Sequence, residues 1–230
     1  MIKRNIVLLL GVFLCVTVIG QIGKHHFKDV GLCDVNCLED MDPYSFYFES
    51  VDSEEEAAYY EKYKDKYIKE LEEFQMIYVA APTGNYKMGT STGMQEVRVT
   101  RVIQGSKELE NQCVWIDGMP GLAYGEEDEL YVDMFLNYMQ KDNEYLVFCD
   151  AYGPINVRGQ NNCSKYYVTD SIFGYVNITN RESTGKIIDK NQKYTMKDLS
   201  GYEFFADCRD VLEIKQEIKE ELIDKFLKEY

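Results

Sequence analysis

Histidine is scarce in this chain, and its scarcity argues against one common catalytic arrangement. Only His25 and His26 occur among the 230 residues. Residues 89–93 (GTSTG) match the G-x-S-x-G pattern of a nucleophile elbow, which needs a histidine later in the chain to take the serine proton. Both histidines come earlier, so we predict that residues 89–93 form a loop between two strands and not the site of a serine hydrolase.

The same two histidines do not complete a metal site, because adjacent side chains diverge and no third histidine exists. The acidic run at residues 126–129 (EEDE) is dense enough to suggest calcium. It lacks the spaced oxygen ligands and the central glycine of a calcium loop. We interpret this run as the acidic first turn of a helix, and we predict no metal and no other cofactor.

Positive charge is also in short supply. The chain has 25 Lys and Arg against 40 Asp and Glu, a net charge of −15. An acidic surface repels the phosphates of nucleic acids and the headgroups of anionic lipids, so we expect no nucleic-acid partner. Paired carboxylates that hydrolyse a glycosidic bond are a less favoured alternative, since their separation is not visible in a sequence.

Charge is absent altogether from residues 5–23, which follow Lys3 and Arg4. A basic start and an apolar run of this length are typical of an export signal or an N-terminal transmembrane helix. Basic residues at the N-terminus favour keeping that end in the cytoplasm. We therefore predict a membrane anchor, or a cleaved signal peptide, over residues 1–23. The bulk of the chain is expected outside the cytoplasm, at the cell membrane or secreted.

Six cysteines follow that segment, and only Cys15 lies within it. An even number of cysteines in an oxidising compartment permits three disulfides, with the pairing left open. We predict disulfides, with buried free thiols as the alternative. The six residues are Cys33, Cys37, Cys113, Cys149, Cys163 and Cys208.

The exported part divides by composition into three segments. Residues 24–52 form an acidic neck, part of which carries aromatic residues that can pack on the domain. Residues 53–180 form the central domain with its leading helix. Residues 181–230 hold a polar excursion and a closing amphipathic helix.

The hydrophobic period changes along these segments. Apolar residues recur every three or four positions over residues 53–73, 126–140 and 207–229, which predicts three helices. Shorter runs have the apolar character or alternation of strands. These runs are residues 75–81, 95–103, 112–117, 144–150 and 165–179.

Three strands, a helix and two strands, in this order, fit a five-stranded Greek-key barrel of the OB type. The predicted fold class is therefore α+β, a β-barrel with flanking helices. The runs YVAAPTGN, MQEVRVTRVIQGS and NEYLVFC resemble the netrin-like barrels of metalloprotease inhibitors and are similar to uncharacterised exported bacterial proteins. The resemblance covers residues 75–150 and implies the barrel. In those inhibitors a cysteine at the mature N-terminus binds zinc, and no cysteine opens a plausible mature chain here.

A barrel of this type binds ligands on the face of its second and third strands and in the adjoining loops. We therefore expect a ligand face near Arg98, Arg101, Trp115 and Tyr124, although Trp115 is also a good core residue. The predicted function is a non-enzymatic binding module whose partner is an extracellular protein or glycan. A protease inhibitor of the netrin-like type is the alternative.

Overall fold

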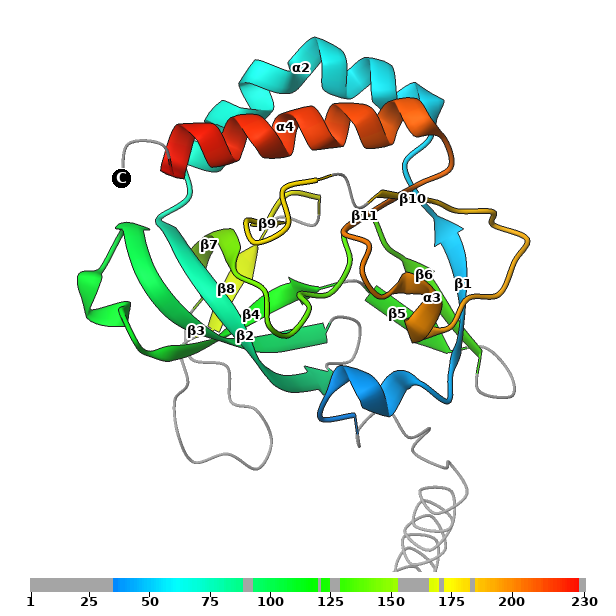
Figure 1. Cartoon of the computed structure of the whole chain (residues 1–230), viewed down its shortest axis with the longest axis horizontal. Coiled ribbons are helices and arrows are strands. Elements are labelled where there is room, and N and C mark those ends of the chain that lie inside the picture. The colour runs from blue at the N-terminus through cyan, green and yellow to red at the C-terminus, as the bar shows by residue number, and fades with distance from the viewer. Residues whose placement is uncertain are drawn as a thin grey trace, which may run out of the picture. The chain divides into compact units, whose positions relative to one another are not determined.

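Figure 1 shows the computed structural model of the chain. It describes residues 35–88, 93–119, 121–124, 129–152, 166–169, 172–182 and 185–227. These residues have an α+β architecture, in which a multistranded, mainly antiparallel sheet is flanked by helices. The predicted signal or anchor over residues 1–23, both histidines and residues 89–92 of the GTSTG segment lie outside the described residues.

The two long helices are those that the apolar periodicity predicted. Helix α2 spans Glu54–Glu72 and helix α4 spans Arg209–Leu227. The start of α2 is fixed by Ser53, whose backbone N–H donates to Glu56 Oε2 at 2.8 Å, as in a capping box. The helices run side by side (Figure 1), and Lys64 of α2 bridges to Glu221 of α4 at 3.0 Å.

The main sheet contains six strands in the order β2, β3, β4, β8, β7, β9. Parallel pairing occurs only between β4 and β8 among these described strands, and β2 makes an additional antiparallel pairing with β7. The bounds are Met76–Met88 for β2, Gly93–Gln104 for β3, Cys113–Met119 for β4, Tyr166–Thr169 for β8, Tyr145–Tyr152 for β7 and Tyr175–Asn177 for β9.

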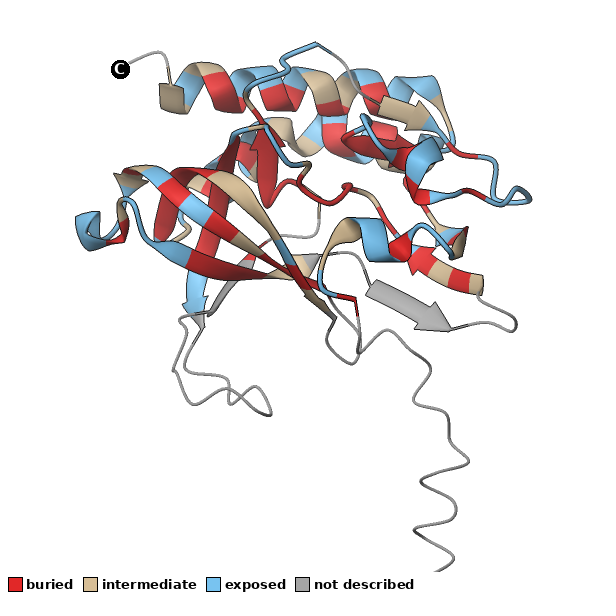
Figure 2. Ribbon diagram, turned by 60° about the horizontal axis from the view of Figure 1, so that its bottom comes forward, coloured by how far each residue is buried: buried red, intermediate tan, exposed pale blue. Residues whose placement is uncertain are grey.

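The core lies between this sheet and the two helices. Figure 2 shows buried residues along the strands and on the sides of the helices that face them. Phe148 of β7 meets Phe226 of α4 edge to face with ring centroids 5.3 Å apart. Tyr60 of α2 meets the fully buried Phe173 in the same manner. Aromatic contacts of this kind add to the stabilisation from burial.

One predicted helix is wrong. Residues 129–133 form strand β6 (Glu129–Asp133), which pairs in parallel with β1 (Ser45–Ser50) and antiparallel with β5 (Gly121–Tyr124). Leu130 and Val132 are buried while their neighbours are partly exposed, so the burial follows the period of a strand. The parallel partner lies far away in the sequence, and a local hydrophobic period does not reveal it.

The predicted neck and the predicted polar excursion also contain ordered elements. Strand β1 lies within the neck and buries Phe46 and Phe48. It is preceded by a short 3₁₀ helix, η2 (Leu38–Met41). The excursion holds strand β10 (Gly185–Ile187), which pairs in parallel with β11 (Phe204–Ala206), and the one-turn helix α3 (Met196–Leu199).

Two other predictions need correction. No helix in the described part of the chain is both long and apolar enough to cross a membrane. Helices α2 and α4 are long, but each carries a charged outer face. The cysteines that the structure describes form no disulfide: Cys37, Cys113, Cys149 and Cys208 are free thiols. Cys149 is buried and donates to the Tyr78 hydroxyl at 3.4 Å, whereas Cys113 is exposed at the start of β4. Cys33 and Cys163 lie outside the described residues.

Candidate functional site

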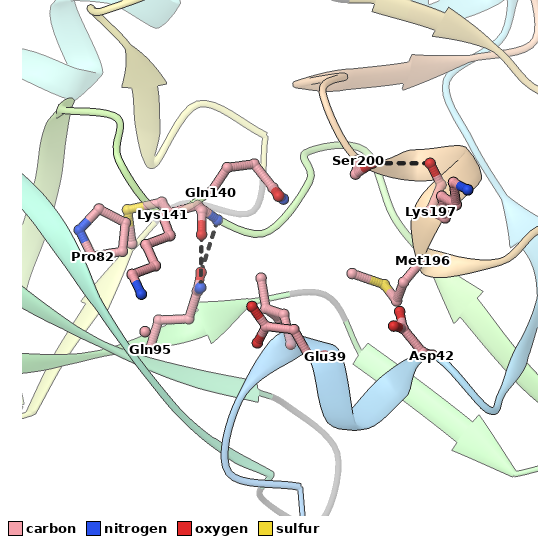
Figure 3. A pocket seen from close by; sticks show the side chains of 12 residues that line it. Glu39, Asp42, Pro82, Gln95, Gln140, Lys141, Met196, Lys197 and Ser200 are labelled. Atoms are coloured by element: carbon pink, nitrogen blue, oxygen red, sulfur yellow. Dashed lines mark hydrogen bonds between the residues drawn. The ribbon is translucent and has the colours of Figure 1, made fainter.

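A pocket of about 290 Å³ opens beside the middle of β2. Segments that are distant in the sequence contribute to it, as Figure 3 shows. Glu39 comes from the 3₁₀ helix η2 and Asp42 directly follows that helix, while the strands provide Pro82 and Gln95. Lys141 comes from the segment that follows Met139, and Lys197 comes from α3.

The floor of the pocket is fixed by Gln95. This side chain is only 3 % exposed. Its Nε2 donates to the Met139 carbonyl at 2.9 Å, and its Oε1 accepts from the Met139 N–H at 2.8 Å (Figure 3). A side-chain amide can satisfy one backbone donor and one acceptor at once. Gln95 therefore holds the segment that carries Gln140 and Lys141 against β3.

The acidic wall follows from the geometry of η2. A 3₁₀ helix has three residues per turn, so residues three apart project on the same side. Glu39 and Asp42 have this spacing, and both line the pocket. Asp40 is turned to the helix start, where its Oδ2 accepts from the N–H groups of Asn36 at 2.8 Å and Cys37 at 3.1 Å. These hydrogen bonds lower the pKa of Asp40.

The wall from β2 is an irregularity in the strand. Pairing with β3 passes from Pro82 directly to Tyr86, so three residues of β2 lie outside the register. Glu96 Oε2 holds them, because it accepts from Thr83 Oγ1 at 2.8 Å and from Asn85 Nδ2 at 2.7 Å. Gly84 has a φ of +94°, a conformation that glycine adopts without steric cost. The sequence analysis wrongly ended the strand at Pro82.

The last wall is α3. Thr195 caps this helix, since its Oγ1 accepts from the Asp198 N–H at 3.3 Å, and the buried Met196 lines the pocket. Ser200 donates from its hydroxyl to the Lys197 carbonyl at 2.9 Å. Its hydroxyl hydrogen is therefore donated to a backbone carbonyl.

The pocket combines charges of both signs. Within the described part of the chain, no salt bridge involves any of its four charged lining residues. These residues are Glu39, Asp42, Lys141 and Lys197. An arrangement of this kind can bind an ammonium group of a ligand through the carboxylates and a carboxylate through the lysines. In the described residues, no group of three acidic, cysteine or histidine side chains is placed to hold a metal ion.

A smaller cavity of about 80 Å³ is lined in part by Gln140, which also lines the first. Its walls are polar. Tyr175 donates to the Asn137 carbonyl at 2.6 Å, and Asn137 Nδ2 donates to the Leu199 carbonyl at 2.8 Å. Burial raises the pKa of Tyr138 and of Tyr175. These contacts tie the segment after β6 to α3 and β9, and so support the larger pocket.

The residues of the predicted ligand face are placed differently. Arg98 is exposed on β3, and its Nη1 lies 3.5 Å from the Asn111 carbonyl. Trp115 lies on the neighbouring strand β4 and is only 8 % exposed, with Lys87 Nζ 4.2 Å from its ring centroid. Arg101 is half-buried. Tyr124 belongs to β5, opposite Leu130 in the separate three-stranded sheet.

The sequence analysis missed the pocket itself. One signal was present, namely the three-residue spacing of Glu39 and Asp42 in a segment interpreted as solvated neck. Lys141 gave no signal, because it follows the run that was interpreted as a helix.

Comparisons of the chain with protein-family models, curated protein sequences and solved structures found no match.

Proposed function

We propose that this protein is a non-enzymatic binding module whose pocket takes a small charged solute. One observation carries the proposal: Glu39 of η2 and the adjoining Asp42 line a cavity of about 290 Å³, and Lys141 lines it from another segment. This volume is at the lower end of the range for small-molecule sites, which begins at roughly 300 Å³. A small ligand therefore suits the pocket better than a macromolecule.

The barrel of the OB type is part of this proposal. Support comes from the pairing of the strands, because β2 is hydrogen-bonded to β3 on one edge and to β7 on the other. The parallel pair β4–β8 and the antiparallel pair β8–β7 connect the remaining strands. Five strands linked in this order are what a Greek-key barrel with one parallel pair requires.

Binding is favoured over catalysis by the way the polar groups of the pocket are used. A serine nucleophile needs a base within hydrogen-bond reach, but Ser200 donates to a backbone carbonyl. Gln95 is fully used in holding Met139. The charged side chains of the lining are then suited to bind a ligand.

The ligand is proposed to be an extracytoplasmic solute, in place of the protein or glycan partner expected from the sequence. Support for this location comes from the uncharged run at residues 5–23 after Lys3 and Arg4, which is typical of exported chains.

Saturation-transfer NMR with the full chain tests the proposal. The probes are propylamine, propionate and alanylalanine, each at millimolar concentration. At least one probe should show saturation transfer with the unmodified chain and lose it with Ser200→Trp, which places a large ring in the mouth of the pocket. The matched control is Ser106→Trp, because Ser106 is exposed and makes no side-chain cap hydrogen bond. Absence of transfer for every probe, or equal transfer to both variants, would overturn the proposal.

A further inference from the structure

The geometry points to a zwitterionic ligand of about dipeptide size, with its ammonium group against η2 and its carboxylate against Lys141. This inference rests on the proposed function and specifies the ligand of the same pocket. It follows from three features of the lining: carboxylates in and just after η2, a lysine on another wall, and several apolar residues.

The acidic side is well suited to an ammonium group. Glu39 of η2 and Asp42, the residue after η2, both line the pocket and can offer acceptor oxygens to a cation. The third acid of this segment, Asp40, is occupied by two backbone N–H groups. Two carboxylates therefore line this side of the pocket, and a second anion in the ligand would be repelled there.

On the basic side, the backbone that carries Lys141 is held in place. Lys141 is two residues after Met139, and both backbone groups of Met139 are bound by the buried Gln95. The start of the Lys141 side chain is therefore fixed relative to β3, and Figure 3 shows this side chain on a different wall from Glu39. The flexible ammonium group of Lys141 can then bind a ligand carboxylate as a point charge.

The pocket also has apolar lining residues. Met139 and Met196 are buried residues of the lining, and Leu38 and Pro82 join them. Methionine side chains adapt to ligands of different shape. A ligand with charges at its two ends and an uncharged body between them matches this arrangement, and the free termini of a dipeptide provide it.

Isothermal titration of the full chain with four forms of alanylalanine tests the inference. The forms are the free dipeptide, its N-acetyl derivative, its C-terminal amide and the doubly blocked compound. Loss of a charged contact weakens affinity, and 1.4 kcal/mol corresponds to tenfold in Kd. Each single block should therefore weaken binding roughly tenfold or more, and the double block should weaken it further.

Variants that remove charge from the pocket test which terminus of the dipeptide each side of the pocket binds. Lys141→Met should weaken the free dipeptide about tenfold and leave the amide unchanged, because the amide has no carboxylate to lose. Glu39→Gln combined with Asp42→Asn should weaken the free dipeptide and leave the N-acetyl form unchanged. Glu213→Gln and Lys66→Met, both at exposed positions on helices, are the controls and should change neither affinity.

Each outcome bears on one of the two claims. Equal binding of the free and doubly blocked dipeptides, abolished by Ser200→Trp, would overturn the zwitterion and leave the binding pocket in place. Binding of propylamine or propionate alone, without any dipeptide, would do the same. Failure of every dipeptide and of both single-charge probes would overturn the binding pocket as well.

Discussion

Lys219 Nζ of α4 lies 2.6 Å from Glu203 Oε2, and both side chains are buried. Glu203 Oε1 accepts a second hydrogen bond from the Asn177 N–H at 2.6 Å, while Lys219 Nζ donates to the Asn180 carbonyl at 2.8 Å. One helical turn earlier, Lys215 forms a second buried ion pair, with Asp52. These pairs fix α4 over the strands, because each buried charge is satisfied only when the helix is docked.

Loss of one partner from the buried pair should be costly. Lys219→Met leaves the Glu203 carboxylate buried without a cation, and we expect a loss of about 3–5 kcal/mol in the free energy of unfolding. Urea denaturation followed by circular dichroism measures this loss. The double variant Lys219→Met with Glu203→Leu should recover much of it, since no unpaired charge remains.

The control is an exposed ion pair of the same residue types. Lys66 and Glu70 lie 3.3 Å apart on the surface of α2, and Lys66→Met should change the free energy of unfolding by no more than about 0.5 kcal/mol. A similar small effect for Lys219→Met would show that the buried pair does not hold the helix.

Gln95→Leu should destabilise the fold and weaken ligand binding together. The substitution removes both hydrogen bonds to Met139 and leaves a backbone donor and acceptor without partners, at a cost of about 1–3 kcal/mol for each group. Chemical denaturation and titration with alanylalanine measure the two effects. Gln112→Leu, at an exposed position, is the control. If Gln95→Leu reduces stability but not affinity, Gln95 does not position the ligand site.

Stability should fall in alkaline solution because of the buried tyrosines. Burial raises the pKa values of Tyr86, Tyr138, Tyr145 and Tyr175, so the folded state holds these protons more tightly than the unfolded chain. The stabilising contribution is complete below the unfolded tyrosine pKa of about 10 and is lost as the pH rises above it.

Tyr138→Phe removes one of these groups, so its stability should decrease less steeply than that of the unmodified chain between pH 9 and 11. Denaturation midpoints at several pH values give the two slopes. The control Tyr59→Phe changes a tyrosine that is 51 % exposed and should leave the slope unchanged. Parallel curves for Tyr138→Phe and the unmodified chain would contradict the expectation.

The free cysteines should differ in reactivity. Burial raises the pKa of Cys149 to about 12, and the thiolate is the reactive form. At pH 8 we expect iodoacetamide to modify the exposed Cys113 within minutes and Cys149 only after unfolding. Peptide mapping by mass spectrometry identifies the modified residues. Rapid modification of Cys149, or its recovery in a disulfide, would contradict the arrangement around Tyr78.

The sequence predicted the two long helices and the strands of the main sheet, but not the strands of the smaller sheets. Helices α2 and α4 were confirmed because each has an apolar stripe and charged outer positions, which are local properties. Strand β6 was interpreted as a helix, because Leu130, Met134 and Tyr138 are four residues apart. Its pairing with β1 joins segments more than seventy residues apart, and such pairing overrides a local period.

The pocket could not be predicted from any single segment. Gln95 and Met139 are 44 positions apart, and η2 and α3 come from opposite ends of the described chain. The predicted ligand face followed from the fold analogy alone, and Tyr124 was assigned to it although β5 belongs to another sheet. A functional prediction that rests on the fold alone is weak, because function depends on the residues of a particular site.

The Asp52–Lys215 pair has a consequence for biosynthesis. Asp52 precedes α2 and is synthesised early, whereas its cation is in the last helix of the chain. A chain without α4 has no buried cation for this carboxylate, so α2 reaches its final packing only once α4 is present. A chain truncated before Arg209 would therefore leave Asp52 without its buried partner.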